Sequence, residues 1–489
     1  MKNILSKICI AAVASVVIAS CSKLEEKPYS FFTPNQFYQS GSDAEAGLTA
    51  VYGSLAQLYS YVMWQLSDYS ADQMFPRAVV NRDQVTAFTY DANSEFVATY
   101  WNSCYAGINN ANTLLANIDK VAMNDNRKKQ IKAEAYFLRG LFYFSLAKAF
   151  GQVPIHTEPV TNIGNTETPK STEAEVYALV VSDLAKAETD LPLSPTERGR
   201  TSKAATLALE AKVFLYMKDY NKSAAKANEL LSAPGTFGLV NDVIDLWDVE
   251  KEDANRKENI FAAEFSRQPN LVSTIMIGYF APGGSAPLFT QIAYGSQFAY
   301  LQFYGSFNNN DRRKMLMDTF YINTAGQRIG QSNSLLKGRA FIRKYFDRNS
   351  NGPNGENNYP IVRFADVLLI YAEAEARQNG PSAATYNAVN QVRRRAFGQP
   401  LNQPSQYDLP AGLSKDDFVN AVLQERSFEL CFESDRWYDL TRTNNFLSVA
   451  NTTNAEYPVR NVQPKHRFFP VPLNEVLTNS KIEQNPQWK

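Results

Sequence analysis

The stretch "TSKAATLALEAKVFLYMKDYNKSAAKANELLS", residues 201–232, decides the fold class. Thr201 or Ser202 can cap the start of a helix, because a hydroxyl oxygen accepts hydrogen bonds from the first free backbone N–H groups. Apolar residues then recur with helical spacing on one face, namely Ala204, Leu207, Ala208, Ala211 and Leu215. After a short turn at residues 218–220, a second helix follows with Ala224, Ala227 and Leu231. The small residues predict a hairpin of two closely packed helices.

Such a hairpin resembles a tetratricopeptide unit. Residues 361–398 predict a second one, in which Gly380 and Pro381 end the first helix. Its first apolar face consists of Phe364, Val367, Leu368, Tyr371 and Ala372. Further helical patterns occupy residues 98–119, 133–151 and 171–191, without a fixed repeat length. We therefore predict a mostly α protein, with divergent helical hairpins at about 45–234 and 361–445.

Two regions interrupt the helical pattern. Residues 68–94 have no sustained apolar stripe, and residues 235–360 are richer in Gly, Asn and Pro. The segment "GYFAPGGSAPLFTQIAYGSQFAYLQFYGSFNNN", residues 278–310, concentrates aromatic residues in a loop-like setting. Aromatic rings outside helical stripes are harder to explain by helix packing, and binding residues are frequent on loops. We expect a large irregular region at about 235–360 and ligand contacts in both regions.

The N-terminal stretch "MKNILSKICIAAVASVVIAS", residues 1–20, has the form of a secretory signal peptide. Its apolar run, residues 8–19, is shorter than the ~20 residues that span a bilayer. Small residues before Cys21 resemble a bacterial lipobox, which predicts that Cys21 becomes a lipidated N-terminus. The alternative is an ordinary signal followed by a chance cysteine. We expect residues 21–44 to form an anchored tether.

The composition excludes several classes of function. The 489 residues have a formal net charge of +0, which gives no indication of nucleic-acid binding. Only 2 His accompany 26 Tyr and 30 Phe, which argues against a site with several histidine ligands. No cofactor and no metal site is predicted. An envelope location would permit a disulfide between Cys104 and Cys431, but their apolar helical contexts favour buried free thiols.

The stretch "QERSFELCFESDRWYDLTRTN", residues 424–444, raises the question of catalysis. Glu425, Glu429 and Glu433 share one helix face, and paired carboxylates can hydrolyse glycosidic bonds. Such carboxylates usually come from different elements around a cleft, however, and nearby arginines would keep these acids ionised. We favour a structural network of ion pairs. The chain also lacks GxSxG, HExxH, GxxxxGK[ST] and metal-spaced Cys/His motifs.

Several motifs together resemble the SusD/RagB family of nutrient-binding lipoproteins of Bacteroidetes. They are "ERSFELCFESDRWYDLTRTN" (425–444), "PIVRFADVLLIYAEAEARQNG" (360–380), "AVNQVRRRAFG" (388–398), "YWNSCYAGINNANTLLANID" (100–119) and the ending "RFFPVPLNEVLTNSKIEQNPQW" (467–488). With the lipobox, they are spread in the expected order over essentially the whole mature chain.

This resemblance implies one SusD-like α-helical domain at 45–489, carried outside the outer membrane by lipid. It implies a partner, a SusC-like TonB-dependent transporter barrel, to which the protein passes captured oligosaccharides or, in the RagB branch, peptides. Family members are not enzymes, and Arg436, Asp439 and Arg442 would have structural roles. A membrane contact is expected through the lipid anchor alone.

Candidate ligand contacts follow from the two irregular regions, because Tyr and Trp stack on sugar rings and polar groups bind the hydroxyls. For each residue, packing in the core or at an interface is the alternative. The candidates are Trp64 just before the first region, Tyr69, Asp72, Phe75, Arg77 and Tyr90 within it, and Tyr279, Tyr294, Tyr300 and Tyr304 in the second. Trp101 and Trp437 are expected to pack between helices. Three other functions remain open: a peptide-binding protein, a secreted glycoside hydrolase, and a scaffold that binds protein alone.

Overall fold

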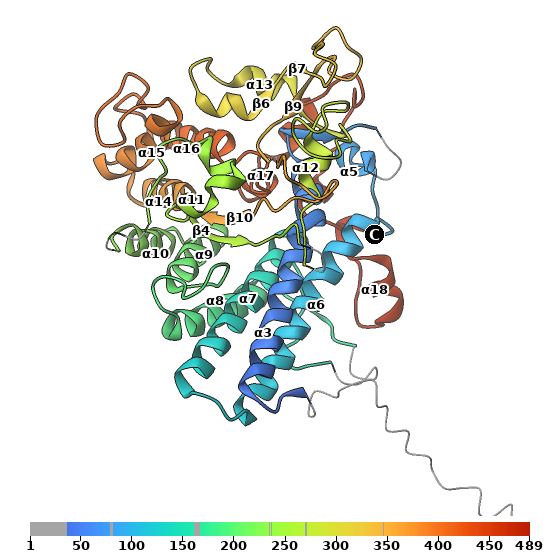
Figure 1. Ribbon diagram of the computed structural model, residues 1–489. Helices are drawn as coiled ribbons and strands as arrows, with labels where there is room; N and C mark the ends of the chain where they lie inside the picture. The colour runs from blue at the N-terminus through green and yellow to red at the C-terminus, as the bar shows by residue number, and fades with distance from the viewer. Residues whose placement is uncertain are drawn as a thin grey trace, which may run out of the picture.

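The computed structural model describes residues 37–78, 82–160, 167–233, 235, 237–268, 271–345 and 347–489. Helices dominate the described chain (Figure 1), which confirms the prediction of a mostly α protein. The long helices are α3 (Gly41–Gln57), α6 (Glu95–Asn117), α7 (Asp125–Phe150), α8 (Glu173–Asp190), α9 (Lys203–Tyr216), α10 (Tyr220–Leu231), α14 (Phe364–Asn379), α15 (Ala383–Ala396) and α16 (Lys415–Glu429). No helix of these residues is long and apolar enough to cross a membrane.

The predicted hairpin of residues 201–232 is α9 and α10. Ser202 caps α9, since its hydroxyl oxygen accepts a hydrogen bond from the Ala205 N–H at 3.2 Å. The second predicted hairpin is α14 and α15, with Gly380 at φ 86° just after α14 and Ser382 capping α15. A backbone position with this φ favours glycine, because glycine has no Cβ. Gly380 adopts it and leaves the helical conformation, so α14 ends there.

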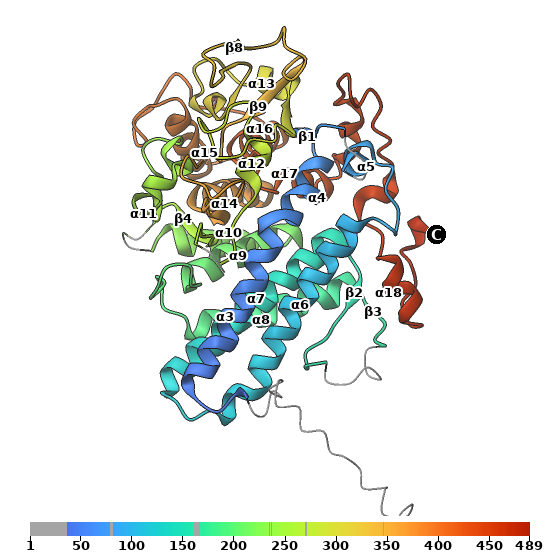
Figure 2. The same cartoon turned by 45° about the vertical axis from the view of Figure 1, so that its right-hand side comes forward.

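The helices form a continuous scaffold. Helices α3, α6, α7 and α8 pack side by side (Figure 2), and α7 is buried around most of its circumference from Ile131 onward. Helix α10 packs against α14, so the two hairpins touch although about 130 residues separate them in sequence. The intervening region therefore leaves and re-enters the scaffold between two neighbouring helices.

The region between the hairpins is less irregular than the sequence predicts. It contains β4 (Asn259–Ala263), β5 (Gln297–Tyr300), β6 (Met317–Asp318), β7 (Tyr321–Ile322), β8 (Arg328–Ile329), β9 (Arg339–Ile342), α11 (Glu252–Asn255), α12 (Met276–Phe280) and α13 (Leu301–Ser306). These elements have two to six residues each, too few to show a clear period in the sequence.

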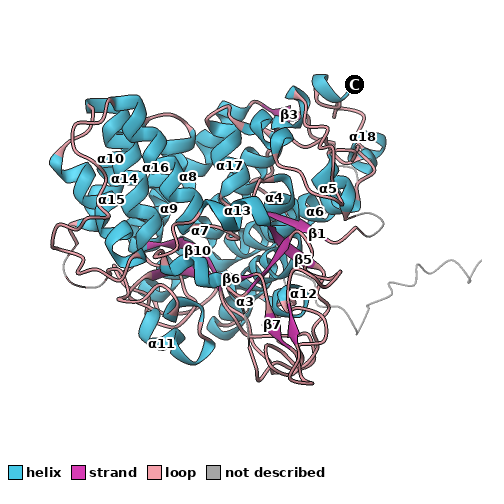
Figure 3. Cartoon of the chain, turned by 90° about the horizontal axis from the view of Figure 1, so that it is seen from above, coloured by secondary structure: helices cyan, strands magenta, loops and turns pink. Residues whose placement is uncertain are grey.

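Short strands join distant parts of the chain. One antiparallel sheet has the order β1 (Met74–Pro76), β5, β9, β6, and it fastens the segment after α4 (Met63–Ser70) to the region between the hairpins. Strand β4 pairs with β10 (Tyr359–Arg363), which leads directly into α14. Seen from above (Figure 3), β1, β5 and β6 lie beside α12 and the loops around β7. Strand β2 (Val153–Pro154) pairs with β3 (Lys170–Ser171).

The C-terminal part closes the structure. Helix α17 (Arg436–Arg442) contacts α4, and α18 (Leu473–Thr478) lies near α6 (Figure 2). Most buried apolar side chains form one cluster, and a second one joins α14, α15 and α16. Trp101 and Trp437 are buried, as the sequence predicts. Cys104 and Cys431 are buried free thiols, as their apolar helical contexts in the sequence predict.

Candidate ligand-binding site

Four partly exposed aromatic rings gather where three distant segments meet, and we call them the aromatic platform. They are Tyr61, Phe96, Tyr279 and Tyr294. The ring centroid of Tyr279 lies 6.0 Å from that of Tyr61 and 5.3 Å from that of Tyr294. The ring centroids of Tyr61 and Phe96 lie 6.5 Å apart. Tyr294 is the most accessible, with 45% of its surface exposed.

The local structure explains how these rings reach the surface. Tyr61 lies in a single π-helical turn, Leu58–Val62, inserted between α3 and α4. The wider turn shifts the side chains that follow relative to an uninterrupted α-helix, and such turns are frequent at functional sites. Phe96 lies in the first turn of α6, and Tyr279 lies in α12.

Backbone hydrogen bonds hold the segment of Tyr294 against α12. The Tyr294 N–H donates to the Gly278 carbonyl at 2.7 Å, and the Ser296 N–H donates to the Tyr279 carbonyl at 3.1 Å. Between them, Gly295 has φ 56°, and a Cβ atom there would lie 2.4 Å from the backbone N of Gly283. Only glycine fits this close approach, so the position of Tyr294 depends on it.

Arg82 is the charged group of the platform. Its guanidinium lies 4.8 Å from the ring centroid of Tyr279, and its Nη2 donates to the Tyr279 hydroxyl at 3.2 Å. Burial raises the pKa of Tyr279, so its hydroxyl stays protonated at neutral pH. The platform thus offers ring faces, hydroxyl groups and a cation, which is the chemistry that binds sugar rings and their polar substituents.

A second layer of aromatic side chains supports the platform from below. Trp64 is fully buried, with its ring centroid 5.9 Å from Tyr61 and 6.3 Å from Tyr279. Tyr69 is also fully buried, and its hydroxyl accepts a hydrogen bond from the side chain of Gln297 at 2.7 Å. These rings position the platform and do not themselves face solvent.

The structure corrects several predicted ligand contacts. Trp64, Tyr69, Phe75, Tyr90 and Tyr300 are at most 3% exposed, so their rings contact protein atoms, which is the packing alternative left open by the sequence. Asp72 forms an ion pair with Arg436, which donates hydrogen bonds of 2.8 and 2.9 Å to its two carboxylate oxygens. Its carboxylate therefore already has a protein partner.

These corrections have physical reasons. All eight residues of α4 are buried, polar ones included, so this helix has no apolar stripe and looks irregular in sequence. Phe75 and Tyr300 lie on the paired strands β1 and β5, with ring centroids 4.6 Å apart. Tyr90 packs among aromatic residues of the C-terminal segment.

Four predicted residues remain accessible. Tyr279 and Tyr294 belong to the platform, Arg77 is exposed, and Tyr304 is partly buried with the Lys314 ammonium 4.7 Å from its ring centroid. The sequence missed Tyr61, Phe96 and Arg82. Arg82 lies inside the irregular region 68–94 and could have been found there, whereas no sequence signal marks the other two. Cys21 lies outside the described residues.

A separate cavity of about 240 Å³ lies between α6 and α18. Trp101 and Tyr105 line it, with ring centroids 5.0 Å apart, together with His156 and Glu475. Trp101 is 2% exposed and packs edge-on against Phe150, in agreement with its predicted packing role. No group of side chains suited to a metal ion occurs among the described residues.

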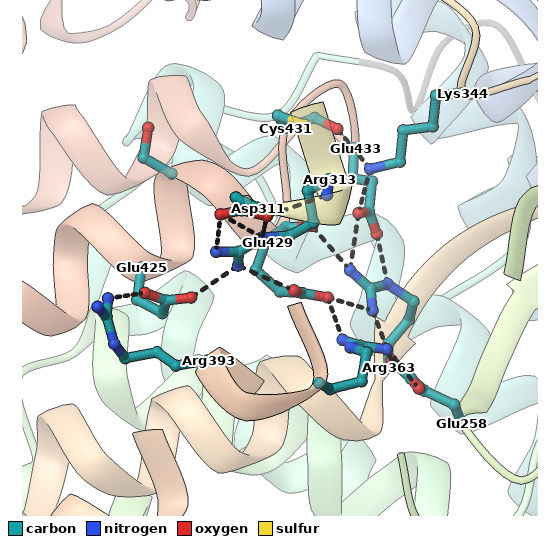
Figure 4. A network of polar contacts seen from close by, with 12 residues as sticks. Glu258, Asp311, Arg313, Lys344, Arg363, Arg393, Glu425, Glu429, Cys431 and Glu433 are labelled. Carbon is teal, nitrogen blue, oxygen red and sulfur yellow. Dashed lines mark hydrogen bonds and ion pairs between the residues drawn. The ribbon is translucent and has the colours of Figure 1, made fainter. Parts of the chain in front are cut away.

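Glu425, Glu429 and Glu433 belong to a buried ion network (Figure 4). Glu429 accepts hydrogen bonds from Arg395 at 2.6 Å, Arg363 at 3.1 Å and Arg313 at 3.2 Å. Burial alone would raise the pKa of Glu429, but the three arginines outweigh it and lower the pKa to about 2. A carboxylate held ionised in this way cannot serve as a general acid at neutral pH.

The network fastens α16 to the rest of the protein. Glu433 pairs with Lys344 and Arg363, and Glu425 pairs with Arg313 and Arg393. The signature continues in α17, where Asp439 pairs with Arg426 and Arg442, and Arg442 also pairs with Glu373. The predicted structural interpretation of this stretch is confirmed.

Comparisons with known proteins agree with this architecture. A family model described as "SusD family" matches residues 294–488, and one described as "Starch-binding associating with outer membrane" matches residues 24–215. SusD-like protein P2 of Formosa agariphila is 27% identical over 503 residues, covering 97% of each chain. A SusD-like protein of Bacteroides ovatus is 23% identical over 473 residues, covering 90% of this chain and 83% of the relative.

Solved structures share the fold. A SusD homolog from Bacteroides thetaiotaomicron has a TM-score of 0.81 at 23% identity, covering 93% of this chain and 98% of that one. A laminarin-binding SusD-like protein has a TM-score of 0.76 at 23% identity, covering 92% and 100%. The two family models, the relatives and this shared fold together support a SusD-like family protein.

Proposed function

We propose that this protein binds an oligosaccharide at the aromatic platform and does not alter it chemically. The observation that carries the proposal is the meeting of four partly exposed rings with Arg82 on one surface. The apolar faces of a sugar ring stack on aromatic rings, while its hydroxyls bond to phenol and guanidinium groups. The carboxylate of Glu429 in α16 forms ion pairs with three arginines and performs no catalysis in this proposal.

Relatives support a carbohydrate as the ligand class. One structural neighbour is described as laminarin-binding, and another is surface glycan-binding protein A from Bacteroides uniformis, with a TM-score of 0.76 at 22% identity. At the level of the family, carbohydrate binding is supported. The sugar that a relative binds is not carried over to this chain. Its own sugar has to be inferred from the residues of its platform.

The proposed setting is the outer face of the outer membrane. The lipobox at Cys21 would anchor the protein there, and the polar tether with Glu25 and Glu26 resembles a surface-export signal. In this setting the protein would deliver its ligand to a SusC-like TonB-dependent transporter barrel. Support for this partner comes from the family resemblance of the sequence. Co-purification of the native lipoprotein from outer membranes, with or without a large barrel protein, tests it.

Titration calorimetry tests the binding proposal. We would use soluble protein starting after Cys21, and titrate it with a panel of oligosaccharides and with a mixed peptide digest. Tyr294→Ala and Tyr279→Ala should each weaken glycan binding about five- to tenfold, because a sugar ring stacked on an aromatic ring contributes ~1–1.4 kcal/mol. Tyr220→Ala is a matched control, since Tyr220 also stacks with an arginine, Arg377, at 5.5 Å, but on α10.

The outcomes separate the candidate functions. Glycan binding that weakens in both platform variants and persists in Tyr220→Ala supports the proposal. Binding heat with peptides alone would identify a peptide-binding protein. Turnover of a glycan would identify an enzyme. Binding to neither, together with tight barrel association, would leave a protein scaffold.

A further inference from the structure

Arg82 at the platform and Arg77 on a neighbouring segment have no acidic partner. Most arginines of the described chain form ion pairs with Asp or Glu. Arg82 and Arg77 form none with any described carboxylate. Unpaired arginines at one partly exposed surface leave a positive charge that a ligand can neutralise.

The guanidinium of Arg82 is held in place. It lies over the Tyr279 ring and donates from one nitrogen to the Tyr279 hydroxyl. It makes no other hydrogen bond to a described residue, so most of its N–H donors are directed to solvent or to a ligand. A guanidinium fixed in this way is suited to two parallel hydrogen bonds with a carboxylate or a sulfate.

Arg77 is close to the same surface. Its backbone N–H donates to the Ser296 carbonyl at 2.7 Å, and the Ser296 N–H donates to the Tyr279 carbonyl at 3.1 Å. Arg77 therefore starts from the chain segment directly beside the Tyr279 segment. Its side chain is exposed.

Buried charge beneath the platform has the same sign. Arg460 is 3% exposed, and it donates to the backbone carbonyls of Tyr69, Ala71 and Thr86 at 2.8–2.9 Å instead of to a carboxylate. Asp72, on the same segment as these carbonyls, is paired with Arg436 at 2.8 Å. Asp83 follows Arg82 in sequence but forms no ion pair with it.

We infer that the glycan bound at the platform carries an anionic group, a uronate carboxylate or a sulfate ester, which Arg82 binds while the sugar ring stacks on Tyr279. The inference rests on the proposed function and narrows its ligand class. Arg77, exposed on the neighbouring segment, is the candidate for contact with a second anionic substituent along the chain of sugars. A neutral glycan would leave both guanidinium groups without a charged partner.

Matched pairs of glycans test this inference on the soluble protein. The probes are oligogalacturonates with their carboxyl-reduced counterparts, sulfated galactan oligosaccharides with their desulfated counterparts, and neutral laminarin oligosaccharides. We expect an anionic probe to bind at least tenfold more tightly than its neutral counterpart. Its affinity should also fall as the NaCl concentration rises, because the contact is partly exposed. The two pairs distinguish carboxylate from sulfate.

Variants assign the effect to Arg82. Arg82→Gln should weaken binding of the anionic probe about tenfold, and Arg82→Lys should retain part of the affinity because it keeps the charge. Arg467→Gln is the matched control, since Arg467 also lies over an aromatic ring, that of Phe468, at 5.3 Å, and has the same charge change. Thermal melting would verify that each variant is folded.

Each result decides the matter. A neutral probe that binds as tightly as its anionic counterpart, with no change in Arg82→Gln and no salt dependence, would overturn the inference and leave glycan binding intact. No binding of any probe, or of any glycan in the calorimetry panel, would overturn both. The salt dependence of the unmodified protein gives an answer even if a variant does not fold.

Discussion

Replacing Glu429 by Gln tests the structural interpretation of the buried ion network. The network pairs five acids with five bases: Glu258, Asp311, Glu425, Glu429 and Glu433 with Arg313, Lys344, Arg363, Arg393 and Arg395. Gln keeps the shape of Glu429 but leaves one positive charge uncompensated in the interior. Breaking a buried ion pair in this way costs ~3–5 kcal/mol of unfolding free energy.

The pH dependence gives an independent magnitude. Burial opposes ionisation of Glu429, but three arginines lower its pKa to about 2, well below the ~4.3 of an unfolded chain. A carboxyl group with a depressed pKa stabilises the fold above its unfolded pKa, and this contribution disappears as the pH falls toward 2. The difference corresponds to ~3 kcal/mol. Glu429→Gln should lack this part of the pH dependence.

Urea unfolding followed by tryptophan fluorescence, at pH 7 and at pH 3.5, measures both effects. Glu483→Gln is the control, because Glu483 pairs with Lys489 on the exposed C-terminal surface and its loss should leave stability unchanged. An unfolding free energy of Glu429→Gln within ~1 kcal/mol of the unmodified protein at pH 7 would refute the reasoning. Loss of a glycan-cleaving activity in this variant would instead assign Glu429 a catalytic role.

Three further predictions concern the scaffold and the site. Ser202→Ala should lower the unfolding free energy by ~1 kcal/mol through loss of the α9 cap, and Ser202→Gly by less, as thermal melting can measure. Gly295→Ala should weaken glycan binding along with stability, since its Cβ would meet the Gly283 backbone; unchanged affinity in calorimetry would contradict this. Cys104 and Cys431 should not react with Ellman's reagent in native protein and should both react in urea, because burial raises their thiol pKa values, to about 11 for Cys431.

The hairpins were predictable because the sequence signals for their helices and turns lie within each hairpin. Residues 201–232 carry a capping serine, an apolar stripe and a short turn, and the structure uses all three. The network around Glu429 was predictable in kind, since acids and arginines alternate in the same stretch. Its partners from the region between the hairpins, such as Arg313 and Lys344, have no local signal, because tertiary contacts alone bring them there.

The candidate site was predicted less completely, for a related reason. The sequence singled out two irregular regions, and the structure brings parts of both together at Tyr279 and Arg82. It could not separate rings that face solvent from rings beneath them, because Trp64 and Tyr279 differ in depth and not in type. Burial of polar residues in α4 removed the pattern that would have identified this helix as core.

The buried ion network also sets an order for folding. Arg313 and its partner Glu425 are 112 residues apart, and Arg395 reaches back 137 residues to Glu258. Helices α3 to α10 follow one another in sequence and can pack early. The contacts of Arg313 and Arg395 with the glutamates of α16 can form only after α16 has been made and has folded. A chain in which α16 has not yet packed therefore holds interior charges that only the complete network neutralises, and such partly folded states are prone to aggregate.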